Sequence, residues 1–157
     1  MKPDQRGLTM TEIAGIADRL ARLEAADAIR ALKLRYLRAC DDKDTEAMRA
    51  CFVPDNAHIH YDRIGSFPGR DALVQCFVEL ACRTTLREMH FAGASEIRVL
   101  DADTAQGSWD LAYLALDDAN GSRTFLTGRY ADEYVRVDRA WLIRSTVFTT
   151  GLLSQGS

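Results

Sequence analysis

Hydrophobic positions repeat at helical spacing through the first quarter of the chain. Apolar side chains recur every three or four residues at Ile13, Ile16, Leu20 and Leu23, and the helical pattern continues from Ile29. That period is typical of an amphipathic α-helix. Thr9 is followed three residues later by Glu12, which is the pattern of a capping box at a helix start. We therefore predict two helices, at about 10–24 and 26–41, with at most a short break between them.

The next segment alternates between short elements and turn signals. A short helix is predicted from Thr45 to Cys51, and the alternating residues 57–61 predict a strand. Residues 65–69 contain two glycines and a proline, so a loop is expected there. Residues 70–82 have the spacing of a second amphipathic helix.

The second half of the chain changes from helical to strand-like periodicity. Four β-like runs, at 86–99, 104–116, 123–137 and 141–149, are separated by turns rich in Asp, Asn and Gly. Helices followed by a meander of long strands is an α+β pattern, with helices on one face of a curved, mostly antiparallel sheet.

Length and composition fit one globular domain. The chain has 157 residues, of which 47% are hydrophobic and 27% charged, so it can bury a sizeable core. We expect a flexible lead over 1–9, a single domain over 10–150 and a C-terminal tail over 151–157.

Charge and targeting signals narrow the class of partner. The net charge is −3 and no basic stripe is present, which argues against nucleic acid or an anionic membrane as a partner. No apolar run approaches the roughly 20 residues of a membrane span. The four cysteines form no CxxC pair, and the first residues lack an apolar signal core. These features predict a cytoplasmic protein with reduced thiols.

Alternation along the strands gathers aromatic side chains on one face. Strand periodicity places Trp109 with Tyr113, and Ile59 with Tyr61, while Tyr130 shares its face with Asp132. Tyr and Trp combine an apolar ring with a polar end that usually finds a partner when buried. A ligand pocket would provide such partners, and so would an ordinary core with bound water.

The candidate chemistry centres on Asp41 and His90. His90 stands among apolar residues at the start of a long strand, next to Phe91, and Asp41 ends the early helix. A carboxylate bonded to one imidazole nitrogen fixes the tautomer and makes the other nitrogen a better base. Read from residue type alone, a lone histidine among apolar residues is more often structural, and Asp41 is more often a helix-end residue.

Other polar residues receive simpler interpretations. His58 and His60 lack a third ligand at suitable spacing, so no metal site is expected. Asp110 lies opposite Trp109 and suits a structural or interface role. Cys40 is expected to pack in the core because no base points to it.

The order of short motifs resembles the SnoaL-like branch of the nuclear-transport-factor-2-like (NTF2-like) superfamily over about residues 12–149. The segments that carry the resemblance are 28–32 with Arg35-Tyr36, 40–44, the strand ending at Tyr61, 69–73, 89–91, 107–109, 128–130 and 137–141. The resemblance implies a cone-shaped fold, in which N-terminal helices close over a strongly bent sheet and leave one apolar pocket.

The resemblance also implies roles for individual residues. Asp41 and His90 match the acid–base pair of family enzymes that carry out eliminations, such as scytalone dehydratase, a bile-acid dehydratase and hexachlorocyclohexane dehydrochlorinase. Tyr36 and Tyr61 match pocket tyrosines of two of these. A late arginine of the dehydrochlorinase falls at Thr146, two residues from Arg144. The residues that read the substrate in those enzymes are not kept here, so the resemblance implies a reaction class and no particular substrate.

These inferences predict a cofactor-independent dehydratase acting on a hydrophobic, polycyclic or steroid-like hydroxy-ketone. Its catalytic residues would be Asp41, His90, Tyr36 and Tyr61. Its substrate would meet Trp109, Tyr113, Tyr130, Ile59, Phe91, Asp132 and Arg144.

Other functions stay open at this point. The alternatives are an isomerase or cyclase that uses the same pair, a non-catalytic binding or oligomerisation module, and a small subunit of a ring-hydroxylating oxygenase. Because relatives cover an exposed sheet face by self-association, a homo-oligomer, either a trimer or a dimer, is expected.

Overall fold

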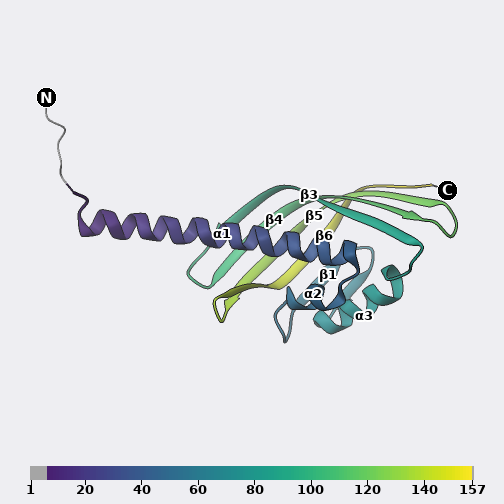
Figure 1. Ribbon diagram of the computed structural model, residues 1–157, viewed down its shortest axis with the longest axis horizontal. Helices are drawn as coiled ribbons and strands as arrows, with labels where there is room; N and C mark the ends of the chain where they lie inside the picture. Colours follow the sequence, from purple (N-terminus) through teal and green to yellow (C-terminus); the bar gives the residue numbers. More distant parts are fainter. Residues whose placement is uncertain (1–6, 157) are drawn as a thin grey trace, which may run out of the picture.

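Helices pack against a mixed sheet in the computed structural model, which describes residues 7–156 (Figure 1). The helices are α1 (Met10–Asp42), α2 (Thr45–Ala50) and α3 (Arg70–Ala81). The strands are β1 (His58–Tyr61), β2 (Gly65–Phe67), β3 (Leu86–Val99), β4 (Thr104–Asp117), β5 (Ser122–Val137) and β6 (Ala140–Gly156). They form one open sheet in the order β2-β1-β6-β5-β4-β3, in which only the β1–β6 pair is parallel. The predicted α+β class and mostly antiparallel sheet are confirmed.

Helix α1 runs without interruption through the break predicted near residue 25. Thr9 caps its start as expected: the Glu12 backbone N–H donates to the Thr9 hydroxyl at 3.2 Å, and the Glu12 carboxylate accepts from the Thr9 N–H at 2.8 Å. The residue at the predicted break is Ala25, a strong helix former, so nothing there stops the helix. The helix ends where Lys43 adopts a left-handed backbone with φ of 58°.

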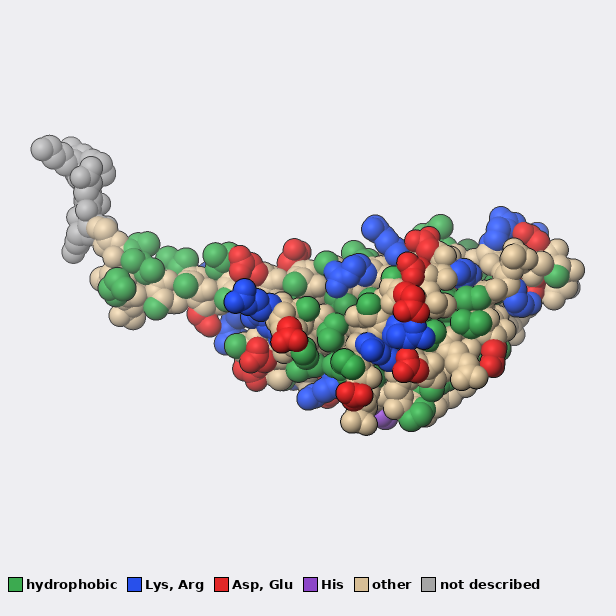
Figure 2. Space-filling view, turned by 60° about the horizontal axis from the view of Figure 1, so that its bottom comes forward, with side chains coloured by type: hydrophobic (Ala, Val, Ile, Leu, Met, Phe, Trp, Pro, Cys, Tyr) green, Lys and Arg blue, Asp and Glu red, His purple; other side chains and the backbone are tan. Residues whose placement is uncertain are grey.

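The first half of α1 extends beyond the sheet. Its apolar stripe is solvent-exposed, with Ile16 49% and Leu23 69% exposed, whereas Ile29 and Leu32 are fully buried. Hydrophobic side chains accordingly gather over this arm in the space-filling view (Figure 2). An apolar helix face without a partner is typical of an interaction surface. The exposed stripe is compatible with the expected homo-oligomer, which stays a prediction because the structure describes a single chain.

The C-terminal end of the chain differs from the expected tail. Residues 151–156 continue β6, where they pair with β5 through contacts such as Leu126 with Leu153. The expected lead includes Thr9, which is the cap of α1, and the rest of the lead up to residue 6, like residue 157, lies outside the described residues. Residues 65–67, expected in a loop, form the short strand β2 beside β1.

Irregular pairing bends the sheet. The register shifts between Ala92 and Ser95 on β3, and between Leu126 and Gly128 on β5. Such bulges increase local twist and bend a strand. At Gly128 a Cβ would lie 2.2 Å from the Phe148 ring, so only glycine allows the close approach of β6. The bend turns one face of the sheet toward the helices (Figure 1).

Helix α1 is long but carries many charged residues. Among the described residues, no helix combines the length and the apolar character needed to cross a membrane.

Candidate active site

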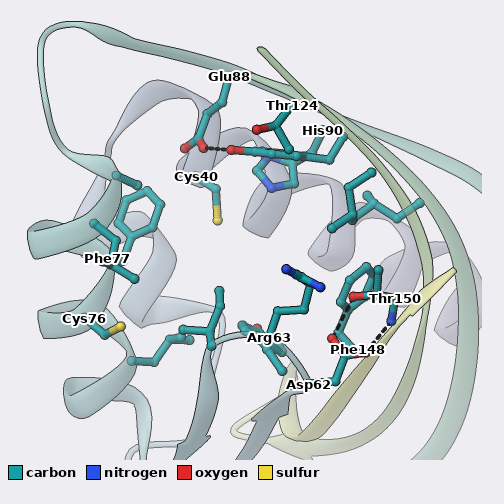
Figure 3. A pocket seen from close by; sticks show the side chains of 18 of the residues that line it. Cys40, Asp62, Arg63, Cys76, Phe77, Glu88, His90, Thr124, Phe148 and Thr150 are labelled. Atoms are coloured by element: carbon teal, nitrogen blue, oxygen red, sulfur yellow. Dashed lines mark hydrogen bonds between the residues drawn. The ribbon is translucent and has the colours of Figure 1, made fainter. Parts of the chain in front are cut away.

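A cavity of about 380 Å³ lies between the bent sheet, the end of α1 and helix α3. Its walls are mainly apolar, with contributions from Leu73, Phe77, Leu111, Leu126 and Phe148. The polar residues that line it include Tyr36, Cys40, Tyr61, Arg63, Glu88, His90, Tyr113 and Tyr130. Figure 3 shows these walls enclosing an open interior. An apolar chamber with a few converging polar groups is the usual form of a small-molecule site.

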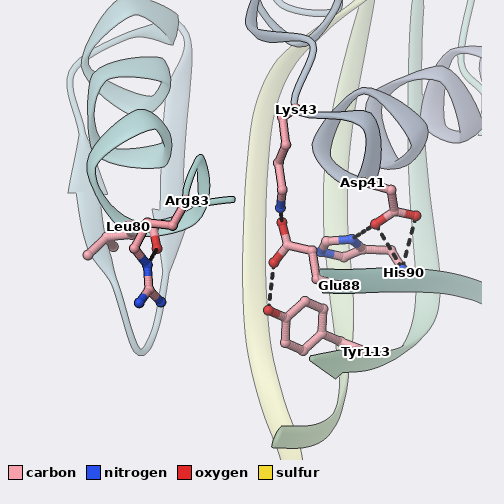
Figure 4. A network of polar contacts seen from close by, with 7 residues as sticks. All are labelled: Asp41, Lys43, Leu80, Arg83, Glu88, His90 and Tyr113. Atoms are coloured by element: carbon pink, nitrogen blue, oxygen red, sulfur yellow. Dashed lines mark hydrogen bonds and ion pairs between the residues drawn. The ribbon is translucent and has the colours of Figure 1, made fainter. Parts of the chain in front are cut away.

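The structure brings Asp41 and His90 together at one wall of this cavity. The His90 ring Nδ1 lies 2.6 Å from the Asp41 Oδ1, and the His90 backbone N–H donates to the same carboxylate at 3.1 and 3.2 Å (Figure 4). The His90 side chain is only 14% exposed, and the Asp41 side chain is 19% exposed. With Nδ1–H donating to the carboxylate, the neutral ring keeps Nε2 as a proton acceptor. In this arrangement Nε2 is the ring atom that remains available to a molecule in the cavity.

Tyr36 and Tyr61 form a second polar group in the cavity wall. Their hydroxyl oxygens lie 2.6 Å apart, and both side chains are almost fully buried. Burial raises the pKa of each phenol above its ordinary value. Both therefore stay protonated at neutral pH. Because one hydroxyl donates to the other, the second keeps a proton that it can offer to a ligand oxygen.

Glu88 is a site residue that the sequence interpretation missed. Its carboxylate forms an ion pair with Lys43 and accepts a hydrogen bond from the Tyr113 hydroxyl at 2.6 Å (Figure 4). The Tyr113 ring in turn lies against the His90 ring, with centroids 4.8 Å apart. Burial, followed by the Glu88 carboxylate, raises the pKa of Tyr113. Since Glu88 is two residues from His90 on β3, strand alternation was a signal that could have placed both on one face.

Lys43 and Glu88 make a second link between α1 and β3. Asp41 and Lys43 lie at the end of α1, and His90 and Glu88 lie on the same face of β3. The Asp41–His90 hydrogen bond and the Lys43–Glu88 ion pair therefore run side by side, and both fix the end of the helix against the strand that carries the imidazole.

Of the predicted substrate-binding residues, two line the cavity and two belong to the core. Tyr113 and Tyr130 line the cavity. Trp109 and Ile59 are buried in the core and do not line it: the Trp109 indole N–H donates to the Tyr134 hydroxyl at 2.9 Å. Their strand faces were assigned correctly, but the cavity does not reach their positions along the strands.

Phe91 and Arg144 lie away from the cavity. Phe91 follows His90 directly, so its side chain points to the opposite face of β3, where it is 49% exposed. The Arg144 side chain is 52% exposed and pairs with Glu133 at 3.2 Å. Both placements correct the expectation that these side chains line the pocket.

Asp132 is buried behind the cavity wall in a polar cluster. It accepts from the Lys33 ammonium at 2.8 Å, the Tyr134 hydroxyl at 2.7 Å and the Thr146 hydroxyl at 2.6 Å. The Lys33 ammonium also lies 3.3 Å from the centre of the Tyr130 ring. Burial lowers the pKa of Lys33, and the Asp132 charge opposes that shift. Helical spacing could have indicated that Lys33 is buried, because it lies four residues after Ile29 and therefore on the same face of the helix.

The other polar residues considered from sequence lie outside any catalytic arrangement. His60 contacts the Ser66 hydroxyl at 2.8 Å, and His58 is exposed. Burial raises the pKa of the Cys40 thiol to about 12, which keeps it protonated. Within residues 7–156 no group of three His, Cys, Asp or Glu side chains could hold a metal ion.

The fold and its enclosed cavity define a class of α+β pocket domains, and the comparisons give the family. The SnoaL-like domain family matches residues 21–147, so the chain belongs to this family. None of the curated protein sequences matches it.

Several solved structures share the fold of this chain. A hexachlorocyclohexane dehydrochlorinase (LinA), type 2, aligns with a TM-score of 0.80 at 18% identity, over 88% of this chain and 93% of that one. A scytalone dehydratase-like protein from Novosphingobium aromaticivorans aligns with a TM-score of 0.77 at 21% identity, over 84% and 87%. An NTF2-like superfamily protein from Salmonella enterica aligns with a TM-score of 0.71 at 18% identity, over 86% and 94%. At these identities the likeness concerns the fold.

Proposed function

We propose that the protein is a cofactor-independent lyase that removes water from a hydrophobic hydroxy-ketone. The observation that carries this proposal is the contact of Asp41 with His90 Nδ1 beside a largely apolar cavity. Two of the structural relatives are named for elimination chemistry, one for a dehydrochlorinase and one for a dehydratase, which supports the same reaction class.

In the proposed reaction His90 is both base and acid. Its Nε2 removes a proton from the carbon next to the substrate carbonyl, and Asp41 remains ionised while it orients the ring and stabilises the imidazolium. The C–H electron pair forms the new C=C bond as the C–O bond breaks. The imidazolium then returns its proton to the departing hydroxyl, which leaves as water.

The tyrosine pair would stabilise charge on the substrate oxygen. Tyr36 and Tyr61 are protonated at neutral pH, as tyrosines ordinarily are, and burial raises their pKa further; the free hydroxyl proton of the pair can therefore donate to the carbonyl as negative charge develops. The apolar walls exclude water and so strengthen that hydrogen bond. The volume, about 380 Å³, lies within the range of sites for drug-sized ligands, which favours a compact polycyclic substrate.

The direct test is the rate of enone formation from candidate hydroxy-ketones, followed by ultraviolet absorbance. His90→Ala and Asp41→Asn should each lower kcat by roughly 10²–10⁴, the usual contribution of a general acid–base group. His60→Ala is the matched control, because His60 contacts Ser66 and does not line the cavity. Full activity in either dyad variant would refute the assignment.

An isomerase or cyclase is a second candidate. The same base and the same tyrosine pair can move a proton between two carbons through an enolate without loss of the hydroxyl. Mass analysis of the product separates the two, because dehydration lowers the mass by one water and isomerisation leaves it unchanged.

A non-catalytic binding module is a further alternative. That reading predicts a cavity filled by side chains, or a His90 that fails to reach Asp41. The open cavity and the 2.6 Å contact favour an enzyme over this reading.

A further inference from the structure

Arg63 is a charged residue in the cavity wall that the dyad chemistry does not use. It lies in the turn between β1 and β2, and its guanidinium projects into the cavity from the side opposite Glu88 and His90 (Figure 3). Within residues 7–156 its side chain makes no hydrogen bond or ion pair. A guanidinium has five N–H donors in a planar fork, so this one can bind an acceptor in the cavity.

Asp62, the acid next to Arg63, takes its hydrogen bonds from Thr150 and not from the guanidinium. Its carboxylate accepts from both the backbone N–H and the hydroxyl of Thr150, each at 2.7 Å. These bonds, led by the one from the Thr150 N–H, lower the pKa of Asp62, and the charge of Arg63 lowers it further. The carboxylate thereby ties the β1–β2 turn to β6.

Backbone hydrogen bonds hold the same turn in place. The Asp62 N–H donates to the Phe148 carbonyl at 3.2 Å, and the Ile64 N–H donates to the Tyr61 carbonyl at 2.9 Å. Arg63 is therefore presented from a fixed backbone, which lowers the entropy lost when its side chain binds a ligand.

The other charged cavity residues already have partners. Glu88 is held by Lys43 and Tyr113, and His90 is held by Asp41. Arg63 is thus the cationic side chain of the cavity wall whose N–H donors remain free among the described residues, and it lies across the cavity from the Glu88–Lys43 ion pair. A ligand anion can pair with these donors, so it enters with its charged end toward the β1–β2 turn.

We propose that Arg63 binds a carboxylate of the substrate and that the natural ligands are hydrophobic carboxylic acids. Two parallel N–H···O bonds between a guanidinium and a carboxylate supply geometry as well as energy. The apolar body then spans the cavity and presents its far end to the dyad. The assignment of that far end as a hydroxy-ketone rests on the proposed function, whereas the recognition of the carboxylate does not.

Calorimetric binding of naphthylacetate, its neutral methyl ester and the cationic naphthylmethylamine tests the proposal without any turnover. The wild-type protein should bind the carboxylate roughly tenfold more tightly than the ester, a modest factor because Arg63 is solvent-accessible. Arg63→Gln should remove this preference while the ester binds as before. Arg63→Glu should reverse it in favour of the amine.

Arg136→Gln is the matched control, since Arg136 is an exposed arginine on β5 that does not line the cavity, and it should keep the wild-type preference. Equal affinity of wild-type protein for the acid and the ester would overturn the proposal. A preference that survives Arg63→Gln but disappears in His90→Ala would also overturn it, because the anion would then sit on the imidazole. A preference retained in His90→Ala supports Arg63 even if the dyad proves to catalyse nothing.

Discussion

Helix α1 sends two charged side chains into the sheet, and the two pairs that result are opposite in character. Lys33 meets Asp132 with both side chains fully buried. Asp41, about two turns further along the helix, meets His90 at the cavity wall with part of each side chain accessible. Both pairs join α1 to a strand.

The two pairs differ in whether a hydrogen-bonding atom remains without a partner. The oxygens of Asp132 accept from Lys33, Tyr134 and Thr146, and the Lys33 ammonium also lies over the Tyr130 ring. Such a pair is closed to ligands and can only hold the fold together. The Asp41–His90 pair uses one ring nitrogen and leaves Nε2 at a cavity, so it can transfer a proton. A charged pair becomes chemically useful when one of its atoms still lacks a partner.

The largest expected effect on stability comes from breaking the fully buried Lys33–Asp132 pair. Lys33→Met leaves the Asp132 charge buried without its counter-ion, and such a loss costs about 3–5 kcal/mol of unfolding free energy. Urea denaturation measures this. The double variant Lys33→Met with Asp132→Leu should recover much of the stability, because it removes both charges. A loss below about 1 kcal/mol in Lys33→Met would show that the pair is not structural.

A smaller loss of stability is expected when the Asp41–His90 pair at the cavity wall is broken. Asp41→Asn removes the carboxylate that holds His90 but exposes no new buried charge, so we expect a loss of about 1.5–3 kcal/mol, the range for hydrogen bonds to charged groups. Its main effect should be on the His90 tautomer, since the Asn amide can present a donor to Nδ1. Nitrogen NMR of the imidazole reports the tautomer directly. An unchanged tautomer would show that Asp41 does not orient the ring.

The smallest effect is expected from a pair on the outer face of the sheet. Arg129 and Asp110 are 2.8 Å apart, but their side chains are 71% and 46% exposed. Solvent screens such a pair, and Arg129→Gln should change the unfolding free energy by less than about 1 kcal/mol. Urea denaturation at low and high salt checks this. If Arg129→Gln lowered the unfolding free energy as much as Lys33→Met, burial would not determine how much an ion pair contributes to stability.

Much of the fold follows from local pattern. Strand β3 has the predicted bounds 86–99, and the other three long strands begin within a residue of their predicted starts. The misses occur where tertiary pairing overrides local signals. Residues 65–67 form β2 because β1 offers a free edge, and β6 continues to Gly156 because β5 is long enough to pair with it.

The sequence by itself determined the elements, the faces of the strands and, through the family resemblance, the pairing of Asp41 with His90. Periodicity can do this because side-chain direction repeats with the local backbone geometry. Only the tertiary structure decided that Asp132 is closed off by Lys33, that Phe91 and Arg144 lie outside the cavity and that Arg63 projects into it. Those outcomes depend on the bend of the sheet and on the depth at which α1 and the β1–β2 turn meet it. No spacing along a single strand encodes either quantity.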